Sequence, residues 1–72
     1  MEVSKTDILI ALDEYIHDRQ DRIIMAKYLT DYPGSLERLA EECDVSVSTV
    51  KRVINRNSFI YRHIPGDELK LN

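Results

Sequence analysis

Apolar residues recur at steps of three and four along the first half of the chain. This spacing brings them to one side of an α-helix; between Thr6 and Tyr32 they are Ile8, Leu9, Leu12, Tyr15, Ile16, Ile23, Ala26 and Leu29. The polar stretch 17–22 interrupts the pattern without a Pro or Gly residue. The segment is therefore predicted to form either one long helix or two.

A second helical pattern follows the turn made by Pro33 and Gly34. Ser35 is a favourable N-cap, because its hydroxyl can accept a hydrogen bond from a backbone amide of the first helical turn. The next apolar residues stand at positions i, i+3, i+4 and i+7, and they are Leu36, Leu39, Ala40 and Cys43. We therefore predict a short helix that starts at Ser35 and buries one face.

A third helix is predicted after a connection of three or four residues, with Ser46 or Ser48 as its N-cap and its end near Asn55 or Arg56. At 100° per residue its apolar positions fall on one side; they are Val47, Val50, Val53 and Ile54. The opposite side carries only hydroxyl, amide and cationic groups, from Ser48, Thr49, Lys51, Arg52, Asn55 and Arg56. Such donors suit phosphates and base edges.

The segment 58–72 has two interpretations. Residues 59–64 are rich in strand formers, and 69–71 alternate across a turn at Pro65 and Gly66, which favours a short β-hairpin acting as a wing. A flexible tail is the alternative, because an isolated hairpin is marginal in water. The predicted fold class is mainly α, a helix-turn-helix domain of three or four helices with this wing or tail.

Length and composition favour one small domain. Seventy-two residues exclude two independent cores, so 1–72 is a single unit comprising 1–32 (N-terminal helix or helices), 35–56 (helix-turn-helix) and 58–72 (wing or tail). Hydrophobic residues make up 43% and charged residues 32%, near the average for globular domains. Apolar runs are too short to cross a membrane, and the N-terminus lacks the features of a secretory signal. We expect a cytoplasmic protein with no membrane partner.

The charge is distributed unevenly along the chain. The formal net charge is -3, but residues 1–44 carry eleven acidic and five basic side chains, whereas residues 45–72 carry five basic and two acidic ones. No carboxylate occurs between Val45 and Gly66. Because salt screens charges beyond about 8 Å, the local sign matters more than the total. The basic window, with Lys51, Arg52, Arg56 and Arg62, favours a polyanionic partner.

Residues for catalysis or cofactor binding are not evident. The single cysteine, Cys43, cannot form an intramolecular disulfide, and with His17 and His63 it matches no zinc spacing. There is no glycine-rich phosphate loop and no Ser-His-Asp arrangement. Cys43 occupies a predicted core position, where a small apolar residue fits. We expect no metal, no cofactor and no enzymatic activity.

Two packed helices joined by a tight turn are the arrangement of a helix-turn-helix, whose second helix enters the major groove of DNA. Ala40 is small where the helices approach each other, and Leu39, Cys43, Val45, Val50 and Val53 are the predicted contacts between them. Asp44 stands where many such motifs have Gly, and Asp tolerates the left-handed conformation better than most residues.

The run from Ser35 to Arg52 resembles bacterial helix-turn-helix transcription regulators, mainly through Val45-Ser46-x-Ser48-Thr49-Val50. Tyr15-Ile16-x-x-Arg19 and Lys27-Tyr28-Leu29 extend the resemblance, over about residues 15 to 56, to the stage III sporulation regulator D family. The resemblance implies promoter binding, with DNA-facing positions at Ser46, Ser48, Thr49, Lys51, Arg52, Asn55 and Arg56.

We predict a sequence-specific, double-stranded-DNA-binding transcriptional regulator with the helix around 47–56 in the major groove. The predicted DNA contacts are Ser46, Val47, Ser48, Thr49, Lys51, Arg52, Asn55, Arg56 and Arg62. Two alternatives remain: an acidic interaction module that binds the transcription machinery through residues 1–32, or the DNA-binding domain of a recombinase or transposase. We also hypothesise a homodimer through the N-terminal stripe Ile8, Leu9, Leu12, Tyr15 and Ile16.

Overall fold

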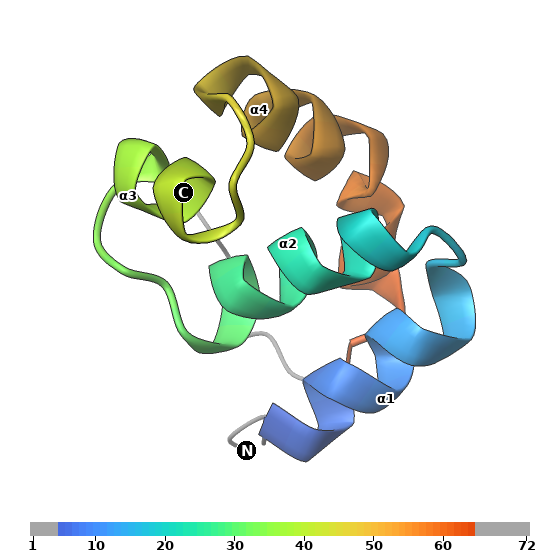
Figure 1. Ribbon diagram of the computed structural model, residues 1–72. Coiled ribbons are helices and arrows are strands. Elements are labelled where there is room, and N and C mark those ends of the chain that lie inside the picture. Colours follow the sequence, from blue (N-terminus) through green and yellow to red (C-terminus); the bar gives the residue numbers. More distant parts are fainter. Residues whose placement is uncertain (1–4, 65–72) are drawn as a thin grey trace.

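The computed structural model describes residues 5–64 of the chain. Within that range four α-helices precede a short 3-10 helix (Figure 1). Their bounds are α1 Lys5–Tyr15, α2 Arg19–Thr30, α3 Leu36–Glu42, α4 Val47–Arg56 and η1 Ser58–Arg62. These described residues form no strand. The predicted mainly helical fold is therefore confirmed.

The N-terminal segment forms two helices, and Asp18 decides where the second begins. Its backbone is extended, and its Oδ1 accepts a hydrogen bond from the backbone N–H of Asp21 at 3.0 Å. On the other side of the corner, Arg22 Nη1 donates to the carbonyl of Ile16 at 3.1 Å. Because both helix ends find side-chain partners in the polar stretch, the chain turns there without a Pro or Gly.

The core lies around α2, which packs between α1 on one side and α3 and α4 on the other (Figure 1). Leu39, Val50 and Val53 are fully buried and Cys43 and Val45 half-buried, as the helix-turn-helix pattern predicts. The complete set of buried apolar residues is Ile8, Ala11, Leu12, Ile16, Ile24, Met25, Leu39, Ala40, Val50, Val53, Ile60 and Ile64.

The stripe predicted to mediate dimerisation belongs mostly to this core. Ile8, Leu12 and Ile16 are at most 4% exposed, because α2 covers their side of α1. Leu9 reaches the surface. Tyr15 also does so, but its ring stacks on that of His63 with the centroids 3.8 Å apart. The stripe as a whole is therefore not available to a second chain.

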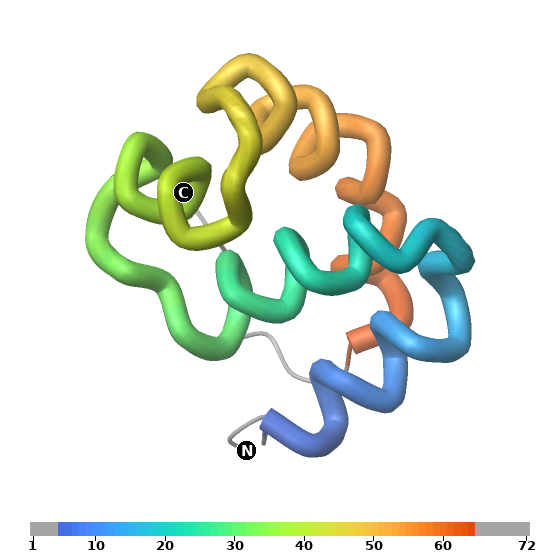
Figure 2. The backbone as a smooth tube through the Cα atoms, viewed as in Figure 1, coloured from blue at the N-terminus to red at the C-terminus, as the bar shows by residue number. Residues whose placement is uncertain are grey.

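Short-range hydrogen bonds define the turn between α3 and α4, which Figure 2 traces as a tight bend. Ser35 caps α3 as predicted, accepting from the N–H of Arg38 at 3.1 Å. At the other end, Val45 N–H donates to the carbonyl of Ala40 at 2.9 Å, and Asp44 N–H to that of Glu41 at 3.2 Å. This pair of bonds is the Schellman motif. It requires a left-handed residue, and Asp44 supplies it with φ 57°.

Replacing Asp44 by Gly should raise the free energy of unfolding by about 1 kcal/mol. Glycine adopts positive φ without steric cost, and the substitution also removes a negative charge from the negative end of the α3 dipole. Urea denaturation followed by circular dichroism measures the gain. Asp44→Ala is the control and should instead lower stability, because alanine keeps the Cβ but lacks the short polar side chain that lets Asp adopt the left-handed conformation. Equal free energies of unfolding for the two variants would contradict the role assigned to the positive φ of Asp44.

The C-terminal hairpin prediction is wrong for its first arm. Residues 58–62 form η1, whose backbone bonds are local, as in His63 N–H to the carbonyl of Ile60 at 2.9 Å. Ile60 and Ile64 are both buried, and a strand would place Arg62 on the same face as these two residues, whereas in η1 Arg62 stays exposed. The predicted second arm, residues 69–71, lies outside the described residues.

Candidate nucleic-acid interface

The outward side of α4 carries a stripe of four exposed polar residues, which we call the α4 stripe. It consists of Ser48, Lys51, Arg52 and Asn55, which stand at i, i+3, i+4 and i+7 and so line one side of the helix. The opposite side is held in the core by Val50 and Val53, both fully buried. Because α4 contains no carboxylate, the stripe has a single sign of charge.

Three other predicted contact residues lie at the start of α4 and have partners within the fold. Ser46 Oγ accepts from the N–H of Thr49 at 3.1 Å and lies 3.0 Å from Thr49 Oγ1. Ser46, not Ser48, is therefore the N-cap. Val47 is half-buried against the core. Because the hydroxyls of Ser46 and Thr49 contact each other, Ser48 provides the outward-facing hydroxyl of this turn.

Arg56 is paired with a carboxylate of α2, which differs from the expectation of a free cation on the outer face. Its Nε donates to Asp21 Oδ2 at 2.8 Å and its Nη2 donates to Asp21 Oδ1 at 2.7 Å. The bond is bidentate, the strongest geometry for this pair. Although half of the Arg56 side chain is exposed, its charge is already matched, so Arg56 joins α4 to α2.

Asp21 is the residue beside the candidate site whose role sequence analysis missed. Its side chain is 5% exposed, and it accepts a third hydrogen bond from Asn57 Nδ2 at 2.8 Å. These bonds, led by that of Arg56, lower the pKa of Asp21 below its usual 3.8. A signal was present, because Asp21 stands three and four residues before the buried Ile24 and Met25, in the apolar register of α2.

A second ionic contact fixes α3 against α2. Lys27 Nζ lies 2.9 Å from Glu42 Oε1, and Arg38 Nε lies 3.6 Å from Glu42 Oε2. The hydrogen bond from Lys27 lowers the pKa of Glu42, and the pKa of Lys27 is raised in turn. Together with the Asp21 contacts, this pairing attaches both helices of the helix-turn-helix to α2.

A shallow groove of about 300 Å³ borders the α4 stripe. Lys51 and Asn55 line it from α4 together with Tyr28 of α2 and Leu36 of α3. The remaining predicted contact, Arg62, is exposed in η1, beyond the end of α4. The structure therefore brings together the stripe residues but leaves Arg62 on a separate element.

Residues 5 to 64 contain no group of three or more His, Cys, Asp and Glu side chains placed to hold a metal ion. Burial raises the pKa of the Cys43 thiol, which fits a packing role and favours the protonated form at neutral pH. None of the helices described there is long and apolar enough to cross a membrane.

The fold and this stripe place the chain in the class of small all-α domains built around a helix-turn-helix. Comparison with known proteins finds no matching family model, and no curated protein or solved structure that is significantly similar. The resemblance to the stage III sporulation regulator D family stays a prediction.

Proposed function

We propose that the protein is a sequence-specific DNA-binding transcriptional regulator that inserts α4 into the major groove. The observation that carries this proposal is the α4 stripe, exposed and of one charge sign, on the second helix of a helix-turn-helix. An α-helix fits the major groove, which is about 12 Å wide. The connection through Asp44 and the ionic contacts of α2 support a fixed orientation of α4.

Each residue of the stripe has a chemical role in this proposal. Arg52 presents a planar fork that matches the O6 and N7 acceptors of guanine, and Lys51 provides a point charge for a phosphate or guanine. Asn55 has the donor and acceptor pair that adenine requires. Ser48 lies in the first turn of α4, where a hydroxyl can bond a base edge or a phosphate. Base readout is thus assigned to Arg52 and Asn55.

The acidic half of the chain favours one orientation on DNA. Residues 1–44 carry eleven acidic and five basic side chains, so this part of the chain has a net negative charge that repels phosphates. Asp21 and Glu42 are neutralised by cations within the fold and add little to this repulsion. The duplex is therefore directed to the side that carries Lys51 and Arg52.

Selection of bound sites from random duplexes tests the proposal. We expect one enriched motif, with affinity for it on the order of a thousandfold or more above that for scrambled DNA of equal length. Fluorescence anisotropy with the two duplexes measures this ratio. Equal affinity for both would reduce the function to non-specific binding, and absence of binding at low salt would overturn the proposal.

The salt dependence of binding is a further prediction. If all four cations of the basic window met phosphates, the slope of log K against log salt would be about -3.6. Because Asp21 already neutralises Arg56 and Arg52 is assigned to a guanine, we expect a slope of about -1.8, from two phosphate contacts by Lys51 and Arg62. Anisotropy titrations at several salt concentrations give the slope. Lys5→Ala, which removes an exposed charge at the start of α1, should leave it unchanged.

A further inference from the structure

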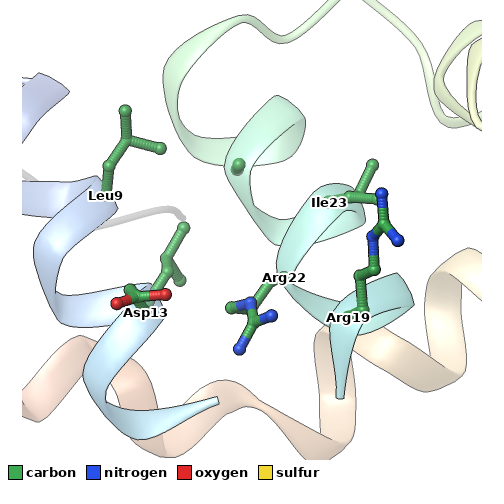
Figure 3. A pocket seen from close by; sticks show the side chains of 7 residues that line it. Leu9, Asp13, Arg19, Arg22 and Ile23 are labelled. Atoms are coloured by element: carbon green, nitrogen blue, oxygen red, sulfur yellow. The ribbon is translucent and has the colours of Figure 1, made fainter. Parts of the chain in front are cut away.

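Large apolar side chains are exposed along the groove between α1 and α2. Leu9 and Ile23 are 46% and 48% exposed. Leu9 and Ile23 line the groove, which measures about 360 Å³, and Figure 3 shows them on opposite sides of it. Side chains of this size gathered on one surface of a small soluble domain indicate an interaction site.

The charges beside this groove have opposite signs on its two sides. Asp13 lies on the α1 side, whereas Arg19 and Arg22 lie on the α2 side (Figure 3). Arg22 donates to the carbonyl of Ile16, at the corner between the helices. Asp13 and Arg19 are exposed, and neither forms an ion pair within residues 5–64. The groove therefore has an acidic side, an apolar centre and a basic side.

A surface of this kind is complementary to itself. A two-fold axis that lies in the plane of contact and runs along the groove places the α1 side of one copy against the α2 side of the other. The apolar centre then meets itself, while each carboxylate meets a guanidinium. A basic or an acidic foreign partner would match only one of the two sides.

We propose that the protein forms a homodimer through the α1/α2 groove. Leu9 and Ile23 lie at the centre of the contact, and Asp13 of each copy faces Arg19 of the other. None of the residues lining the groove belongs to α4, so the dimer keeps both copies of α4 uncovered. Dimerisation also adds buried apolar area to a chain with a small core.

Sedimentation velocity on the full chain tests the contact without DNA, so its result is independent of the proposed DNA binding. We expect reversible dimers over about 5 to 200 μM. Ile23→Glu should raise the dissociation constant at least about tenfold, because it buries a charge at the centre of the interface. The matched control is Phe59→Glu, at a residue of η1 that is 39% exposed, which should leave the dimer intact.

Charge reversal at the two facing residues supplies a sharper test. Asp13→Arg alone and Arg19→Asp alone each place like charges together twice in the dimer, so each should raise its dissociation constant about tenfold. Mixing the two variants in equal amounts makes both contacts attractive again and should restore the original dissociation constant. A contact within one chain cannot produce this recovery.

Three results would overturn the proposal. The first is an unchanged protein that stays monomeric at the highest concentration. The second is an Ile23→Glu variant that remains dimeric while circular dichroism shows a native fold. The third is a mixture of the two charge variants that dissociates as readily as each variant alone, which would remove Asp13 and Arg19 from the interface.

Discussion

Replacing Asp21 by Ala is expected to lower the free energy of unfolding by about 2 to 4 kcal/mol. The substitution removes three hydrogen bonds to a buried carboxylate, and bonds to charged groups are the more stabilising kind. It also leaves a donor of the buried Asn57 with one acceptor fewer, although the same amide still donates to the carbonyl of Val53. Urea denaturation followed by circular dichroism measures the loss.

The same carboxylate makes stability depend on pH in a defined window. The pKa of Asp21 is lowered in the folded protein, chiefly by the bond from Arg56, so the unfolded state takes up the proton more readily. The contribution of this ionised carboxylate to the free energy of unfolding is fully present above the usual pKa of 3.8. It is lost as the pH falls through the lower pKa that Asp21 has in the folded state. Asp21→Asn should therefore make the free energy of unfolding depend less on pH in the acid range. The smaller contribution of Glu42, whose pKa is also lowered, should remain.

Arg56→Ala supplies the matched test of the pair. It leaves Asp21 buried with Asn57 as its remaining side-chain donor, so the variant should be less stable than the unchanged protein. The double variant Asp21→Ala with Arg56→Ala should lose less than the sum of the two single losses. Strict additivity would show that the two side chains contribute independently, in conflict with the bidentate contact.

The parts of the fold that depend on neighbours within a few residues were predictable. The cap at Ser35 and the left-handed turn at Asp44 follow from local backbone chemistry. The burial of Leu39, Val50 and Val53 follows from helical spacing. For the same reason the outward position of Lys51 and Arg52 was predicted from α4 alone.

The parts that depend on long-range contacts were not predictable. On α4 alone, Arg56 belongs to the same polar side as Arg52, and only the packing of α2 brings Asp21, 35 residues earlier, against it. Phe59 and its neighbours favour strands by local propensity, but the core takes up Ile60 and Ile64 without Arg62, which a strand would place on the same face. Long-range packing therefore removes Arg56 from the free cations of the candidate site, whereas Lys51 and Arg52 stay exposed on α4.

The largest effect on binding is expected from the double variant Lys51→Ala with Arg52→Ala. The loss of two cations of the α4 stripe should weaken binding to the selected duplex by about 3 kcal/mol, on the order of a hundredfold in Kd. The salt slope should become less steep by about 0.9, from the lost phosphate contact of Lys51. Both side chains are exposed and unpaired within the described range, so thermal stability should change little.

A charge-conserving control separates sequence readout from attraction to phosphate. Lys51→Arg with Arg52→Lys keeps both positive charges, so the salt slope should stay as it is. The fork that matches guanine moves from position 52 to position 51, so selectivity at one base pair should weaken. Loss of affinity that is equal for selected and scrambled DNA would assign Arg52 to phosphate instead. Binding by the double Ala variant within threefold of the original, on the order of 0.7 kcal/mol, would remove α4 from the interface.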